Sequence, residues 1–184
     1  YHLTFSGVAA HAGNDPEKGR SAITALAKSV IAINALTDWD RGTTLNVGVI
    51  QGGSAANVVA DSAVAELDVR FWENDEYDRV NQALELLCEQ GFLDGVTTTL
   101  TRVNHKPAMA ASDATQALMQ QVEAAGKAEG IDITWQAVGG GSDANHTAAL
   151  GIPPGRYLTR VRVEAAQRLL LHREYTLDVV ASLC

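Results

Sequence analysis

The segment SAVAELDVRF, residues 62–71, has the alternating pattern of a strand that is buried on one face only. Successive side chains of a strand point to opposite faces, so the segment has one apolar face and one largely polar face. The apolar face holds Ala63, Ala65, Leu67, Val69 and Phe71, and the opposite face holds Val64, Glu66, Asp68 and Arg70. Other elements must therefore cover the apolar face.

The sequence on both sides of this strand predicts three more strands and two helices. The strands are expected over residues 1–8, 43–50 and 96–103, and the helices from Asp15, as an N-cap before Pro16, and from about residue 74. The order strand, helix, strand, strand, helix, strand is typical of the split βαβ, ferredoxin-like arrangement, in which two helices cover one face of a four-stranded sheet. We therefore predict an α+β domain over residues 1–105.

Residues 106–184 follow a different pattern, which predicts a second domain segment of the α/β class. A helix capped by Ser112 is expected first, followed by a short strand from Ile131 to Trp135. A glycine-rich turn at residues 139–143 then leads into a short helix that ends at Leu150.

Composition excludes several classes of function. The formal net charge is -8 and no run of Lys and Arg occurs, so no nucleic-acid partner is expected. No apolar stretch reaches the roughly 20 residues that a membrane-spanning helix needs, so no membrane partner is expected. The first residues carry no secretion signal, and we expect a cytoplasmic location. The two cysteines have no disulfide or metal-site spacing.

Four places carry groups suited to chemistry: His11, Asn57, Arg70 and the turn at residues 139–143. Each has an ordinary interpretation when taken alone. His11 could cap a turn, Asn57 could be a turn residue, and Arg70 could form a surface ion pair with Glu66 or Asp68. The glycines could form a loop that holds an anion at a helix start.

Taken together, the motifs resemble a known family. They run in the order SGxxxHAG, GGxxxNVVxxxA, LDVRF and GGGSDANxxAxxGIP, between residue 1 and about residue 153. This order is similar to the lid and C-terminal catalytic segments of the zinc metallopeptidases that include carboxypeptidase G, aminoacylase and succinyl-diaminopimelate desuccinylase. The glycine-rich turn most resembles the glutamate carboxypeptidase branch.

The resemblance implies an enzyme and a homodimer. In this family the split βαβ module is a lid, inserted into a catalytic domain and paired with a second copy. The catalytic domain holds two zinc ions, which activate water for attack on an amide. The implied function is hydrolysis of amide bonds in peptides or N-acyl amino acids that carry a free carboxylate, with glutamyl amides as the first candidates.

The resemblance also implies roles for individual residues. His11 matches the lid histidine that enters the active site of the partner and stabilises the oxyanion, and Asn57 matches the asparagine beside it. Arg70 matches an arginine near the substrate carboxylate. The glycine-rich turn, with Gly139, Gly140, Gly141 and Ser142, is expected to line the substrate site. His2, His105 and His146 are expected to be structural.

The family pattern fails at both ends. Most zinc ligands of the family precede the lid, so they are expected to be absent from this chain, which we expect to be a fragment that is inactive alone. Residues 154–184 are atypical: His172 is the candidate remnant of one zinc ligand, and residues 154–171 could be translated from a shifted reading frame. Two alternatives stay open, a non-catalytic dimerisation or regulatory module and a small-ligand-binding domain of the ferredoxin-like kind.

Overall fold

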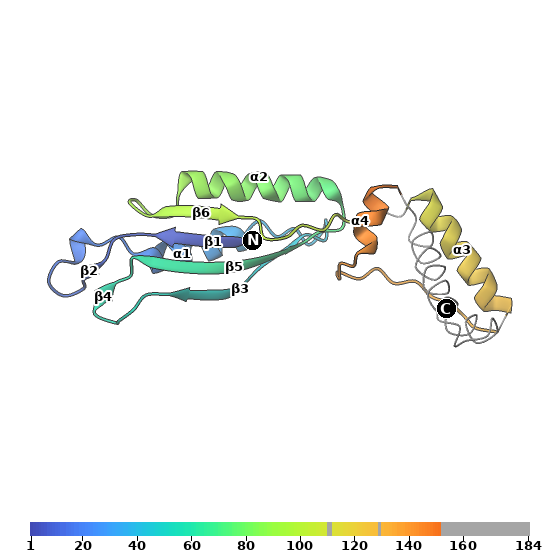
Figure 1. Cartoon of the computed structure of the whole chain (residues 1–184), viewed down its shortest axis with the longest axis horizontal. Helices are drawn as coiled ribbons and strands as arrows, with labels where there is room; N and C mark the ends of the chain where they lie inside the picture. The colour runs from blue at the N-terminus through green and yellow to red at the C-terminus, as the bar shows by residue number, and fades with distance from the viewer. Residues whose placement is uncertain (110–111, 129, 152–184) are drawn as a thin grey trace, which may run out of the picture. The chain divides into compact units, whose positions relative to one another are not determined.

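The computed structural model describes residues 1–109, 112–128 and 130–151 (Figure 1). The chain divides into two compact units, Tyr1–His105 and Lys106–Cys184. The first unit is a mixed α and β structure built around a small sheet, and the second unit contributes two helices among its described residues. Among the described residues, no helix is long and apolar enough to cross a membrane.

The first unit contains a four-stranded antiparallel sheet with the strand order β3-β5-β1-β6. Its strands are β1 (His2–Ser6), β3 (Thr44–Gly52), β5 (Ser62–Arg70) and β6 (Thr97–Thr101). Each of these strands lies within or close to a segment whose alternation predicted it. In β1, Leu3 lies opposite Ala65 of β5 and Leu100 of β6, so apolar residues of three strands share one face.

Two helices, α1 (Ala22–Asn34) and α2 (Asn74–Gln90), cover this apolar face (Figure 1). Phe5, Leu3 and Leu67 from the sheet are buried against Ile33 of α1 and Leu84 of α2. The opposite face of the sheet is left open, because Glu66, Asp68 and their neighbours on alternate positions are exposed. The predicted start of α2 and its end at Gly91, which has a positive φ of 73°, are confirmed.

The predicted start of the first helix at Asp15 is wrong. Pro16–Lys18 forms only a short 3₁₀ turn, η1, and Asp15 makes no side-chain cap. Arg20 then pairs with Val8 through two backbone hydrogen bonds, and α1 begins at Ala22 with Ser21 as its N-cap. This pairing is long-range, so it overrides a helix-start signal that is sound locally.

A small second sheet extends the first unit at one end. It consists of β2 (Ala10–His11) and β4 (Val58–Val59), which pair in antiparallel fashion (Figure 1). Gly7 N donates to Asp61 O at 2.7 Å, so this small sheet continues from the end where β1 finishes and β5 begins.

The described part of the second unit contains α3 (Asp113–Ala128) and α4 (Ala144–Ala149). The predicted Ser112 cap is confirmed, because its Oγ accepts from Thr115 N at 3.2 Å. The predicted strand from Ile131 to Trp135 is wrong, since residues 131–138 form no strand. Alternation alone does not make a strand without a partner to pair with. Instead, Ile133 packs against Gly126 of α3 and Trp135 Nε1 donates to Glu123.

Candidate functional site

His11 lies in β2, exposed, at the end of the first unit that carries the small sheet. Its place is set by the pairing of His11 with Val58 in β4. The turn that follows wraps around the ring: Gly13 N and Asn14 N each donate to His11 Nδ1 at 3.1 Å. His11 therefore caps a turn, as the ordinary interpretation predicts, while its ring edge stays accessible to solvent.

Asn57 is brought next to His11 by backbone contacts. Ala12 N donates to Asn57 O at 2.9 Å, one step along the chain from the pair between His11 and Val58. Asn57 is exposed. Two of the sequence-predicted residues that are far apart in the chain thus lie close together along the paired backbones, and both are exposed. We call this place, formed by His11 and Asn57, the distal site.

Arg70 lies at the other end of the sheet. It is the last residue of β5, opposite Thr44, and its Nε donates to Asp68 Oδ2 at 2.8 Å. The distal site is next to the start of β5, and β5 has nine residues, so about 27 Å of strand separates the two places. Arg70 and the distal site are therefore not brought together within one copy of the chain.

The glycine-rich turn belongs to the second unit. Gly139, Gly140, Gly141 and Ser142 are exposed, and Asn145 holds the turn by accepting from Ser142 N at 2.9 Å and donating to Pro107 O at 2.9 Å. A Cβ added at Gly141 would lie 3.1 Å from Lys106 Cδ, whereas one added at Gly140 would meet nothing within 4 Å. Lys106, which the motif does not include, therefore lies directly beside the turn.

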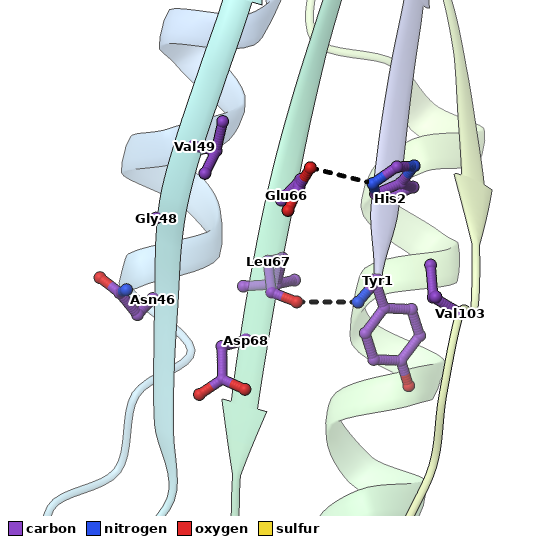
Figure 2. Close-up of a pocket in the computed structure, with 9 residues that line it drawn as sticks. All are labelled: Tyr1, His2, Asn46, Gly48, Val49, Glu66, Leu67, Asp68 and Val103. Atoms are coloured by element: carbon purple, nitrogen blue, oxygen red, sulfur yellow. Dashed lines mark hydrogen bonds and ion pairs between the residues drawn. The ribbon is translucent and has the colours of Figure 1, made fainter.

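A cavity of about 290 Å³ lies on the open face of the sheet (Figure 2). Figure 2 shows the side chains of His2 and Glu66, from the adjacent strands β1 and β5, pointing toward each other, with Asp68 farther along β5. His2 Nε2 lies 3.3 Å from Glu66 Oε1. His11, Asn57 and Arg70 do not line it. The cavity thus marks the polar face that the alternation predicts, and Arg70 reaches its lining through the hydrogen bond to Asp68.

The residues that the structure describes do not fit a metal centre. Among them, no group of three or more His, Cys, Asp and Glu side chains could hold an ion. His172 and the atypical tail after Pro153 lie outside the described residues.

Sequence reasoning missed two groups beside these sites, the turn amides of Gly13 and Asn14 and the side chain of Lys106. Backbone amides carry no residue-type signal, so only the folded turn can show where they point. The only signal for Lys106 was its position at residue 106, where the pattern of the first domain ends. Both groups add hydrogen-bond donors to places that the motifs had already indicated.

Comparison with known proteins gives the family. Residues 1–96 match the family described as "Peptidase dimerisation domain". The chain is 40% identical over 86 residues to one of the chains of p-aminobenzoyl-glutamate hydrolase from Escherichia coli, covering 44% of this chain and 20% of that protein. It is 26% identical over 155 residues to "Carboxypeptidase G2" of a Pseudomonas species, covering 82% of this chain and 37% of that protein.

A solved structure has a similar fold over most of the chain. The tripeptidase of Staphylococcus aureus aligns with a TM-score of 0.67 and 26% identity, covering 83% of this chain and 40% of that one. The chain thus spans well under half the length of the relatives that it matches. The match of residues 1–96 covers more than half of its 184 residues, and the chain belongs to the M20 family of metallopeptidases, in which this segment is the peptidase dimerisation domain.

Proposed function

We propose that an enzyme containing this chain hydrolyses amide bonds in peptides or N-acyl amino acids, with a glutamyl amide that has a free carboxylate as its substrate. Support comes from the named activity of a relative, a hydrolase of p-aminobenzoyl-glutamate. Zinc, as two ions, is the proposed metal, and such sites supply metal-activated water for amide hydrolysis. Its ligands are proposed to lie outside the described residues.

The proposed architecture is a split βαβ, ferredoxin-like lid and dimerisation domain over residues 1–105, followed by a segment of the catalytic domain. The strand order and the two helices on one face of the sheet support the first part. The change of unit after His105 supports the boundary.

The observation that carries the proposal is the separation of the distal site from Arg70. A dipeptide spans only about 7 Å when fully extended, far less than the roughly 27 Å of β5 between the two places. A substrate of that size cannot touch both in a single copy of the chain. If both act on one substrate, two copies must contribute, Arg70 from one and His11 with Asn57 from the other.

The chemistry of these residues suits that division. Arg70 carries a guanidinium fork that matches a carboxylate, and it lies on an exposed strand end. His11 offers a ring nitrogen, and Asn57 a side-chain amide, at an exposed edge where a developing oxyanion needs donors. The turn at Gly139–Ser142 adds backbone amides on the substrate side.

We propose that the second copy binds along α1 and the free edge of β3. β3 has nine uncharged residues, TLNVGVIQG, and an unprotected edge of this length favours pairing with another strand. Ile31 of α1 is 74% exposed and Ile50 of β3 is 58% exposed. Ile23 of α1 lies against Gly52 at the end of the same edge. The other free edge, β6, has only five residues, four of them Thr.

Mixed dimers test the proposal. His11→Ala and Arg70→Ala variants of an enzyme containing this chain are each expected to lose roughly 10²-fold or more in kcat/KM on p-aminobenzoyl-glutamate. Mixing the two variants and allowing their protomers to exchange creates hybrid dimers. In each hybrid, one active site has both an intact Arg70 and the partner's intact His11. About a quarter of wild-type activity should return, because half of the dimers are hybrids with one working site.

No recovery of activity, with hybrid dimers verified by tagged protomers, contradicts the division of the site between two copies. Substrate without a free carboxylate provides a second check, because it should be hydrolysed poorly by the wild type and be insensitive to Arg70→Ala.

A non-catalytic dimerisation module is the second candidate. The match of residues 1–96 favours it, because the matched family is described as a dimerisation domain and that description names no catalytic activity of the domain itself. A purified protein containing this chain that dimerises but binds no metal and hydrolyses no N-acyl amino acid would support the module and exclude the enzyme.

A further inference from the structure

The turn after β2 uses the His11 ring as a hydrogen-bond acceptor. Gly13 N and Asn14 N both donate to Nδ1 at 3.1 Å. The same turn also binds the His11 carbonyl, which accepts from Asn14 N at 3.3 Å and Asp15 N at 3.1 Å. The imidazole thus takes the place that an Asn or Asp side chain often takes in turns.

We propose that the backbone amides of Gly13 and Asn14 position His11 by fixing its tautomer, with the lone pair on Nδ1 and the hydrogen on Nε2. A neutral imidazole has one nitrogen that donates and one that accepts, and the hydrogen bond at one nitrogen decides the state of the other. Two N–H groups directed at Nδ1 leave it no room for a hydrogen of its own. Nε2 is consequently the donor.

This tautomer decides what His11 can do chemically. A neutral His11 with its hydrogen on Nε2 donates a hydrogen bond at the ring edge and cannot accept a proton there. It therefore suits the stabilisation of an oxyanion, and it does not suit a general base acting through Nε2. The catalytic consequence rests on the proposed function, whereas the tautomer itself does not.

The two donors are backbone atoms. The orientation of the His11 ring therefore depends on the backbone of the turn and not on the rotamers of neighbouring side chains. The turn is fixed at one end by the β2–β4 pairing and by the bond from Ala12 N to Asn57 O. Gly13 is not needed for space, because a Cβ added there would lie 3.5 Å from His11 Cε1, an ordinary contact. Gly13 contributes its backbone N–H, which donates to His11 Nδ1.

Nitrogen-15 NMR of the ring in the 184-residue chain tests the tautomer directly, under conditions in which the spectrum shows a neutral imidazole. The expected spectrum has a protonated Nε2 and an unprotonated Nδ1 for His11, assigned by comparison with His11→Gln. A protonated Nδ1 overturns the proposal, whatever the activity of the enzyme.

Matched variants test the positioning role. Asn14→Pro removes the N–H that donates to Nδ1 and, more weakly, to the His11 carbonyl, and Asn14→Ala keeps it. In an enzyme containing this chain, Asn14→Pro should lower kcat by roughly five- to tenfold, the effect of about one hydrogen bond, with little change in KM. Asn14→Ala and Gly13→Ala should match the wild type. Equal losses in Asn14→Pro and Asn14→Ala overturn the role.

These results separate the inference from the proposed function. If the Nε2-protonated tautomer is found but His11→Ala retains full activity, the proposed function fails and the tautomer stands. If Asn14→Pro does not fold, judged from the amide spectrum of the main sheet, the ring spectrum of the unsubstituted chain still decides.

Discussion

Glu76 is a fully buried carboxylate in the first turn of α2. It accepts from Thr43 Oγ1 at 2.6 Å and from Arg79 Nη2 at 2.7 Å, and it lies 2.6 Å from Arg41 Nη1. The hydrogen bonds from Arg79 and Thr43 hold the pKa of Glu76 at about 2, although burial alone would raise it. Arg79 also donates to Leu36 O, so this carboxylate links α2 to the segments on both sides of the turn before β3.

Glu76→Gln should destabilise the first unit by about 3 kcal/mol at pH 7, because it leaves charges near a buried group without their partner. The pKa is lower in the folded state than the ordinary value of 4.5, so the stabilisation is complete above about pH 4.5 and is lost as the pH falls toward 2. Urea unfolding at pH 7 and pH 3 measures both effects. Asp75→Asn is the control, since it removes an exposed partner of the same Arg41 and should change little. A similar loss in both variants would contradict this account.

The sequence contained a signal for Glu76 that was easy to overlook. Glu76 precedes Val80 and Leu84 at intervals of four, which places all three on the buried face of α2. Its partners Thr43 and Arg41 could not be predicted, because they come from a distant turn. The motifs likewise indicated His11 and Asn57 as candidates, but the amides around the His11 ring depend on how the turn closes.

At the scale of elements, α1 shows how two start signals compete. Asp15 with Pro16 resembles a helix start, and so does Ser21. Of the two side chains, that of Ser21 accepts from a backbone amide, Thr24 N at 3.1 Å, and that of Asp15 caps none. A Cβ at Gly7 would lie 1.9 Å from Arg20 O, so the chain at Arg20 runs in close contact with the end of β1. The sequence pattern could place four strands and two helices, but it could not reveal this contact.

Ser21→Ala should therefore destabilise the first unit by about 1 kcal/mol through loss of the α1 cap. Asp15→Ala should have little effect, because Asp15 forms only an exposed ion pair with Lys18. Thermal unfolding of the two variants, followed by circular dichroism, compares them directly. The assignment of the helix start would be wrong if Asp15→Ala were the more damaging change.

Within the first unit, His11 with Asn57 and Arg70 lie at opposite ends of one sheet, so the proposed function depends on self-association. The family match predicts association, but no residue pattern specifies which edge is used, because both β3 and β6 are free edges of the described sheet. Edge length, the absence of charge and exposed isoleucines favour β3 with α1.

Ile31→Lys should therefore separate the dimer. A two-fold axis brings the same surface of both copies together, so each interface would receive two buried lysines from this change. We expect the dissociation constant to rise by roughly 100-fold, about 2.7 kcal/mol, as measured by analytical ultracentrifugation. The fold should be retained, because Ile31 is 74% exposed.

Leu86→Lys, at a 53% exposed position of α2, is the matched control and should leave the dimer intact. If Leu86→Lys separated the copies and Ile31→Lys did not, the partner would bind over α2, and the division of the active site would need a different dimer.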